Sequence, residues 1–505
     1  MSLTTLPGEL YIAIIQHLEP SSWTQVVLTL SRVLPSAPIP TQLLFYSIRI
    51  RQPRQAPALY LRLRKALDAT SSQREITDPC ASWVKELAIE TWTADADVVI
   101  NIVRLLPNLC SLSIRIGPSN FSPEHLEQLF QEPIGTLTHL SLRFRPYVKK
   151  ASYYQFHKGV YFDSTLLALA KWPPQQIPAI SIVQDPQETS SQKRTFAQPI
   201  VFFLLDPHLS VLVHSPSIAY SMTALRLRIP SRPVARSLCV PPSAPTEAYH
   251  SPEATPIVPR LEFLDLSTCG MIEGELDMIL ARFRNLKHLI IDECAVLRVE
   301  GHQGEWGAFG KRCALVGVKR ARDRERELKV ERAGRRGLAA ATISIRDRPA
   351  GNDEVVPTPR DPGLPKPMIP KIRILPFVPG IRSLATTTVI ETEPSHHAAI
   401  RAEFEAGWAE GIAQLEVTRA RMRTSSRNGV RLLHFTEDAQ SVRTTGMEGL
   451  EAVDPDDDDA FAISNDTPPI LCLAGPTRSE HHPPRCGHSV GWNIWHEPTE
   501  EVTID

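Results

Sequence analysis

Apolar residues recur at every fourth position near the start of the chain, which is the period of an amphipathic helix. The stripe consists of Leu6, Leu10, Ile14 and Leu18. Pro7 suits the first turn of such a helix, because no intrahelical hydrogen bond is lost there. Pro20 ends the helix, and Ser21 or Ser22 can cap a second one that carries further apolar residues. The sequence therefore predicts a helical hairpin within residues 1–34.

From about residue 80, the apolar pattern becomes a short strand that recurs with a fixed internal spacing. The two clearest copies begin at Leu261 and Leu286, 25 residues apart, and read LEFLDLSTC and LKHLIIDEC. Other copies begin at Val84, Leu109, Leu137, Ile177 and Met222. The segments between them have helical apolar spacing, so strands and helices are expected to alternate. Units of this size cannot bury their apolar faces alone and should stack on one another.

This spacing resembles the leucine-rich repeat, whose pattern is L-x-x-L-x-L-x-x-N/C with a period of 20–29 residues. Cys269 and Cys294 occupy the N/C position of the last two copies. The resemblance implies a solenoid over residues 80–300. Insertions are expected where the copies lie farther apart, and six prolines between residues 241 and 259 mark one of them.

Residues 301–505 lose the repeat and change in composition. A basic helix is expected at about 318–336, and the Glu325–Lys329 pair supports it at i,i+4 spacing. A proline-rich linker at 349–379 and a helix at about 395–423 follow, and Phe404 and Trp408 lie on one face of that helix. The acidic run at 454–459 and the tail beyond it are expected to be disordered.

The N-terminal hairpin resembles an F-box, the helical motif that docks onto the Skp adaptor of SCF-type ubiquitin ligases. The matching segments are LPGEL at 6–10, Ile14, Leu18, EP at 19–20 and VVLTLSR at 26–32. The family's usual Cys-Arg-Arg-Trp segment is replaced here by SRVL at 31–34. The resemblance implies an F-box-like domain over residues 1–50. It assigns adaptor contacts to Leu6, Pro7, Leu10, Ile14 and Leu18.

An F-box before leucine-rich repeats resembles the F-box/leucine-rich-repeat family of substrate receptors. The predicted fold class is therefore α/β: an F-box-like hairpin, an irregular leucine-rich-repeat solenoid and a largely disordered C-terminal region with two helices. The implied function is substrate recognition, with the Skp adaptor and a cullin-based ligase as partners. Such a receptor raises the effective concentration of its target near the ligase and needs no cofactor.

Two other functions remain open at this stage. The chain can be a leucine-rich-repeat scaffold or interaction module unconnected with ubiquitin, in which the hairpin only caps the first repeat. A hydrolase within residues 300–505 is the third possibility. The chain has no HExxH, phosphate-binding glycine loop or kinase signature, so we expect no enzyme activity.

The concave surface of the predicted solenoid offers a target site, because strand side chains alternate and those between the leucines face inward. The predicted target-binding residues are Arg115, Arg143, Phe144, Arg226 and Arg228, and acidic residues such as Glu90 and Asp265 flank them. Arginines in a row bind carboxylate or phosphate in a bidentate manner, so the expected target is acidic or phosphorylated. The alternative is a solvated face on which the arginines pair with acidic neighbours.

Overall composition restricts the classes of partner that we expect for this protein. The 55 Lys and Arg residues nearly balance the 56 Asp and Glu residues, so no membrane or nucleic-acid partner is expected from bulk charge. No apolar run approaches the ~20 residues of a membrane span and no secretory signal is recognised, so we expect an intracellular protein, cytoplasmic or nuclear. The basic helix allows two interpretations, a nuclear-localisation or nucleic-acid contact and a solvated helix.

The eight cysteines are scattered and include no CxxC pair. This spacing favours neither a disulfide framework nor a zinc site, and we predict no metal. The segments closest to ligand chemistry are His396-His397, His481-His482 and Cys486-Gly-His488. Because none of them pairs with a second set at usual zinc spacing, we interpret them as loop residues or caps.

Overall fold

The chain forms a mixed α/β fold built on one long parallel sheet. The computed structural model describes residues 6–18, 22–72, 80–117, 119–145, 161–174, 177–185, 201–240, 260–294, 304–330, 371–387, 394–435, 449–463, 467–478 and 481–495. Within these ranges, the sheet has ten strands, and its order follows the sequence from β1 to β8 and then β10 and β13. None of the helices described there is long and apolar enough to cross a membrane.

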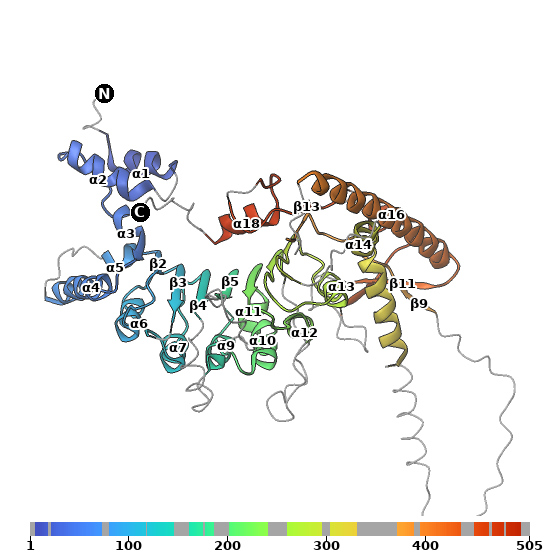
Figure 1. Ribbon diagram of the computed structural model, residues 1–505, viewed down its shortest axis with the longest axis horizontal. Coiled ribbons are helices and arrows are strands. Elements are labelled where there is room, and N and C mark those ends of the chain that lie inside the picture. Colours follow the sequence, from blue (N-terminus) through green and yellow to red (C-terminus); the bar gives the residue numbers. More distant parts are fainter. Residues whose placement is uncertain are drawn as a thin grey trace, which may run out of the picture.

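Strands and helices alternate along the sheet, as the repeat pattern predicts. The strands are β1 (Ser47–Ile50), β2 (Glu86–Ile89), β3 (Ser111–Ile116), β4 (His139–Phe144), β5 (Ala179–Gln184), β6 (Ala224–Arg228), β7 (Phe263–Asp265), β8 (His288–Ile290), β10 (Ser383–Ala385) and β13 (Ile470–Cys472). The helices that follow them include α4 (Gln55–Ser72), α6 (Ala96–Arg104), α7 (Pro123–Phe130), α9 (Asp163–Ala170), α10 (Leu205–Val213), α11 (Pro216–Ala219), α12 (Ala235–Cys239) and α13 (Glu273–Arg282). Figure 1 shows these helices along one side of the strands, which we call the outer face, and the opposite side as the concave face.

The leucines of the repeat pattern form a continuous row through the core between the sheet and the outer helices. Strand register aligns them in the order Leu87, Leu112, Leu140, Ile180, Leu225, Leu264, Leu289, Leu384 and Leu471. Each is at most 3% exposed. The row explains the stacking, because each leucine fills the space between the leucines of its two neighbours.

Cys269 and Cys294 act as buried hydrogen-bond donors at the turns after their strands. Each thiol donates to the backbone carbonyl of a preceding unit at 3.2 Å, Cys269 to Leu227 and Cys294 to Leu266. Burial raises the pKa of the Cys269 thiol to about 12, so this thiol keeps its proton. The N/C position of the pattern thus satisfies carbonyls that would otherwise be buried without a partner.

The N-terminal helices form a small core of their own. They are α1 (Gly8–Gln16), α2 (Trp23–Val33) and the short α3 (Leu43–Tyr46). Ile15, Val27 and Leu43 pack together and are at most 7% exposed. The hairpin therefore holds together through contacts separate from those of the sheet.

The structure differs from the predicted boundaries, because the sheet extends beyond residues 80–300. Strand β1 precedes the predicted solenoid, and β10 and β13 continue it into the C-terminal region. A second sheet joins β9 (Ile372–Ile374), β11 (Arg431–Phe435) and β12 (Leu450–Ala452). Helix α17 (Asp458–Phe461) begins within the acidic run that we expected to be disordered. Strands of three residues contain too little alternation to be recognised in a sequence.

A long helix packs against a shorter one beside the end of the large sheet. The predicted helix at 395–423 is α16 (Pro394–Arg427), and it lies across α14 (Glu305–Ala314). Phe404 and Trp408 on its predicted apolar face are fully buried. A methyl group on Gly407 would collide with the Gly307 carbonyl of α14, so this crossing requires glycine. Residues 331–370, with most of the predicted linker, lie outside the described ranges.

Candidate functional site

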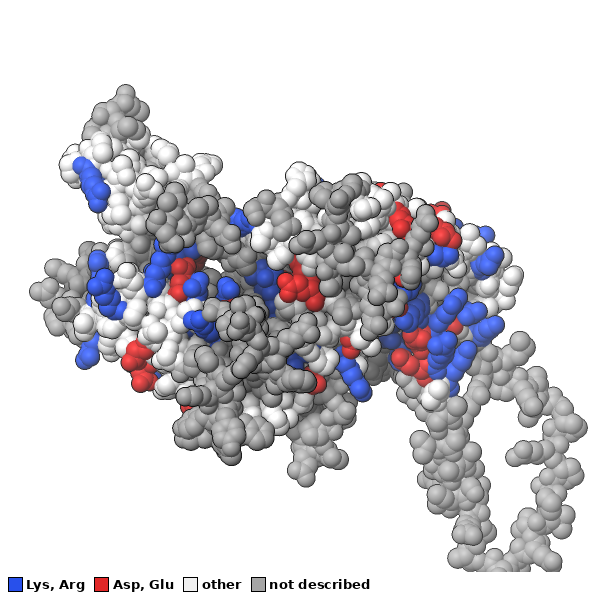
Figure 2. All heavy atoms as spheres, in the orientation of Figure 1, with Lys and Arg blue, Asp and Glu red and all other residues white. Residues whose placement is uncertain are grey.

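The apolar stripe of α1 lies on the outside of the N-terminal hairpin. Leu10, Ile14 and Leu18 are 48%, 52% and 40% exposed, whereas Tyr11 and Ile15 on the adjacent side of the helix are buried. The other two predicted adaptor contacts precede the helix directly, with Leu6 half-buried and Pro7 exposed. The predicted adaptor contacts therefore belong to one accessible region. Figure 2 shows this hairpin as mostly uncharged in the view drawn.

Among the described residues, no helix covers the concave face along its first strands (Figure 1). Arg115 of β3 and Arg143 of β4 stand side by side, because their Cα atoms are register partners. Arg115 donates to the Glu90 carbonyl at 2.8 Å and lies over the ring of Trp92. Arg143 pairs with Asp185 at 2.6 Å while half of its side chain stays exposed. Two of the predicted target-binding residues are thus adjacent and accessible.

Phe144 does not belong to this face. It is 1% exposed and packs edge-on against Phe162 and Phe202 in the core. Its assignment to the concave surface was wrong, because successive residues of a strand point to opposite faces and Arg143 occupies the concave one.

Arg226 and Arg228 also differ from the expected open stripe, because both bind the buried carboxylate of Asp265 on the next strand. Arg226 donates to Asp265 Oδ2 at 3.1 Å and Arg228 at 2.7 Å, while Ser267 donates to Oδ1. Burial alone would raise the pKa of Asp265, but the two arginines hold it well below its usual range. The alternative interpretation, arginines paired with acidic neighbours, holds for these two.

The far half of the concave face is covered by the chain's own helix α18 (Gly487–Ile494). This helix lies across the sheet on the side opposite the outer helices (Figure 1). Its side chains join an apolar cluster with Ala224, Phe263 and Ile290 from three successive strands. The guanidinium of Arg226 lies 5.1 Å from the ring centroid of Trp495, just after α18. Arg226 is only 5% exposed as a result, and a target cannot reach it while α18 is in place.

Gly491 sets how closely α18 approaches the sheet. A Cβ at this position would lie 2.9 Å from Phe263 Cζ and 3.6 Å from Arg226 Nη2. We expect Gly491→Val to lift α18 from the sheet and raise amide hydrogen exchange over residues 487–494 at least tenfold, because the buried ring has no space to yield. The matched control is Asn493→Val, at an exposed position of the same helix. Equal protection in the two variants would contradict the tight contact.

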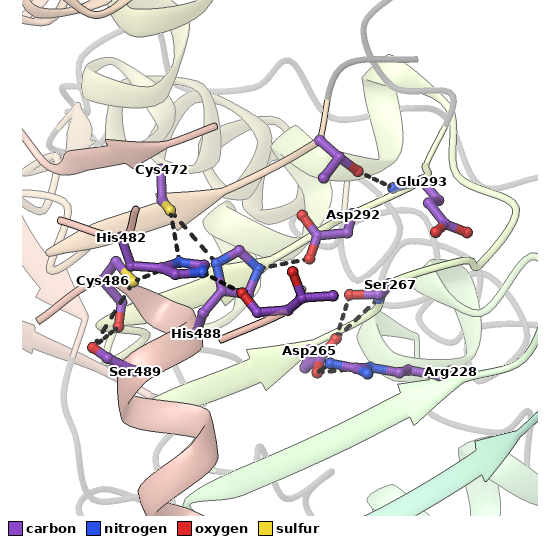
Figure 3. A network of polar contacts seen from close by, with 12 residues as sticks. Arg228, Asp265, Ser267, Asp292, Glu293, Cys472, His482, Cys486, His488 and Ser489 are labelled. Atoms are coloured by element: carbon purple, nitrogen blue, oxygen red, sulfur yellow. Dashed lines mark hydrogen bonds and ion pairs between the residues drawn. The ribbon is translucent and has the colours of Figure 1, made fainter. Parts of the chain in front are cut away.

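Four potential metal ligands meet where β13, the following loop and α18 come together. They are Cys472, His482, Cys486 and His488, and their ligand atoms all lie within 4.8 Å of one another. Figure 3 shows the two sulfurs and the two imidazole rings directed toward one point. His488 Nε2 lies 2.6 Å from the Asp292 carboxylate just after β8. This cluster was not predicted, because neither the nine residues between Cys472 and His482 nor the Cys-x-His pair is a usual zinc spacing. One sign of this cluster was visible in the sequence, the two neighbouring segments that contain His482 and Cys486-Gly-His488.

The basic helix lies at residues 316–330, and most of its charges are paired within the molecule. Glu325 is 6% exposed and accepts hydrogen bonds from Arg373 and the Ile374 amide. Arg324 pairs with Glu327 at 3.0 Å. Blue and red side chains are interleaved over this region in Figure 2. These pairs favour the solvated helix over a nucleic-acid contact.

Comparison with known proteins adds little. No family model matches the chain, and no curated protein does. Among solved structures, it aligns with a chain from the crystal structure of the Rad7 and Elc1 complex in yeast, with a TM-score of 0.20 and 11% identity. The alignment covers 59% of this chain and 89% of that chain. A likeness this weak carries no argument about function.

Proposed function

We propose that this chain is a non-catalytic substrate-recognition subunit of an SCF-type ubiquitin ligase. In this proposal the N-terminal hairpin is an F-box that binds the Skp adaptor, and the sheet with its outer helices is a leucine-rich-repeat solenoid that binds a target protein. Two binding surfaces on one chain bring the target close to the ligase. The chemistry of ubiquitin transfer belongs to the other subunits.

The observation that carries the proposal is the exposed apolar stripe of α1. A helix that needed its apolar residues only for folding would bury them, yet Leu10 and Ile14 are about half exposed while Tyr11 and Ile15 are buried. Exposed apolar residues grouped on one surface are typical of protein-interaction sites. A simple capping hairpin would instead present a polar outer surface.

The open part of the concave face is the proposed target site. Arg115 and Arg143 are adjacent there, and Arg145 lies 5.8 Å from the ring centroid of Trp92, which Arg115 contacts as well. Arginine and tryptophan are enriched among the residues that dominate protein interfaces. The excess of guanidinium groups favours an acidic or phosphorylated target segment. Phe144, Arg226 and Arg228 are not part of this proposed site.

Adaptor binding by the full-length chain tests the proposal directly. We expect the intact chain to bind the purified Skp adaptor, and Ile14→Glu to weaken the complex by roughly tenfold or more, because a carboxylate would face an apolar contact. The matched control is Gln16→Glu, which adds the same charge at an exposed position on another side of α1. Isothermal titration calorimetry provides the three dissociation constants.

Absence of binding by the intact chain would contradict the ligase assignment. It would favour the alternative, a leucine-rich-repeat scaffold unconnected with ubiquitin. Equal weakening by Ile14→Glu and Gln16→Glu would show that the stripe is not the contact surface.

A further inference from the structure

We infer that Cys472, His482, Cys486 and His488 bind one structural zinc ion that fastens the C-terminal helix α18 to the sheet. The four residues come from the end of β13, the loop after it and the beginning of α18. Two thiolates and two imidazoles are a ligand set that zinc prefers, and four protein ligands leave no open position for catalysis.

The distances between the ligand atoms match a zinc tetrahedron. Zinc–sulfur bonds of about 2.3 Å and zinc–nitrogen bonds of about 2.0–2.1 Å place sulfur and nitrogen ligands about 3.6 Å apart. Cys472 Sγ lies 3.6 Å from His482 Nδ1 and 3.5 Å from His488 Nδ1, and Cys486 Sγ lies 3.7 Å from His482 Nδ1. The protein thus already holds these atoms at coordination distances.

The outer contacts of both histidines leave the correct nitrogen available. His488 Nε2 lies 2.6 Å from Asp292 Oδ2, and His482 Nε2 lies 2.8 Å from the Thr477 carbonyl. Both acceptors require a proton on Nε2, so each Nδ1 carries a lone pair directed at the sulfurs. Metal-binding histidines have this arrangement, in which the second ring nitrogen donates to a carboxylate or a backbone carbonyl.

Thiol–imidazole hydrogen bonds alone account for the cluster less well than a bound metal ion does. His482 Nδ1 has one lone pair but faces the sulfurs of both Cys472 and Cys486. The same Cys472 sulfur faces two nitrogens, although a thiol has only one proton. A cation at the centre satisfies all four atoms at once, and the two thiols release their protons when it binds.

Zinc at this position would have a structural role that the apolar contacts of α18 do not supply. Helix α18 has eight residues, and a helix this short is not stable by itself in water. The ion would tie its first turn to β13, and the Asp292 contact would tie it to the segment after β8. The covered half of the concave face therefore depends on the metal.

Metal content of the purified full-length chain is the first test. We expect one zinc per chain by elemental analysis, released when a mercurial reagent caps the thiols. Cobalt substitution should give the intense visible bands of a tetrahedral site and a thiolate-to-cobalt charge-transfer band. Cys472→Ser and Cys486→Ser should each abolish stoichiometric zinc, and His488→Asn should shift the cobalt bands.

Two matched controls separate the cluster from general effects. Cys110→Ser removes a thiol elsewhere in the sheet, and His481→Asn removes the exposed imidazole next to His482; both variants should keep one zinc. A chain without metal overturns the proposal, whether all its thiols are free or Cys472 and Cys486 form a disulfide. Zinc retained by a Cys472→Ser, Cys486→Ser double variant overturns it as well, and this outcome needs no assumption about folding.

Discussion

Replacing Asp265 by alanine is expected to lower the free energy of unfolding by about 3–5 kcal/mol, because two arginines would lose their buried counterion. Asp265 is fully buried, and Arg226 and Arg228 both donate to it. The Arg226 side chain is only 6% exposed, so water cannot replace the carboxylate there. Urea denaturation followed by tryptophan fluorescence measures the change.

The control for Asp265→Ala is the same substitution at Asp185. Its partner Arg143 is 52% exposed, and exposed ion pairs are worth about 0–1 kcal/mol. Similar losses in the two variants would show that burial does not determine the cost. The sequence predicted that Arg226 and Arg228 bind a target. Because both pair with a buried carboxylate, we now expect their substitution to destabilise the sheet instead.

Acid should remove the contribution of Asp265 as well. Its pKa is held below the usual range in the folded chain, so folding favours the ionised form. The resulting stabilisation is complete above about pH 4, the pKa of aspartate in an unfolded chain, and declines as the pH falls toward the lower folded-state pKa. An Asp265→Asn variant should lose less stability than the wild type over this acidic range.

Replacing Leu289 by aspartate is expected to unfold the sheet units around β8. Leu289 is fully buried and lies in register between Leu264 and Leu384. Removal of such a side chain costs about 2–5 kcal/mol, and the carboxylate adds the cost of a buried charge without a partner. Their sum is comparable with the whole stability of a typical domain, about 5–15 kcal/mol. Circular dichroism and limited proteolysis detect the loss.

An exposed leucine supplies the control for this variant. Leu61 on α4 is 54% exposed, and Leu61→Asp should change the stability by less than about 0.5 kcal/mol. If Leu289→Asp melted like the wild type, the row of leucines would not be the core.

The repeat spacing alone predicted strands β2 to β8 and their buried leucines, because a period of two within each strand specifies which residues face the core. Cys269 and Cys294, at the N/C position of the repeat pattern, marked the turns that follow their strands. Adjacent concave residues were also predictable, and both Arg226 and Asp265 were among them. Their pairing depends on strand register, which the sequence leaves open where insertions separate the copies.

Other features could be recognised only in the three-dimensional structure. Strands β10 and β13 have three residues each, too few to show a period. Cys472 and His488 approach each other only because the chain folds back onto its own sheet after β13. The covering of Arg226 by α18 follows from the same return of the chain, and no local pattern indicates it.

The order of the strands has a consequence for how the protein is made. Neighbouring strands up to β8 are close in sequence, so they can pair one after another as the chain leaves the ribosome. His288 and its partner Ser383 on β10 are 95 residues apart, and Asp292 and His488 are 196 residues apart. At about 5–20 residues per second, the ribosome needs about 10–40 s to cover the longer interval. During the first part of that time, until β10 is made, β8 is an open sheet edge, and the concave face of β6 to β8 lacks its cover throughout. Newly made chains are therefore most vulnerable to aggregation late in synthesis, before α18 is in place.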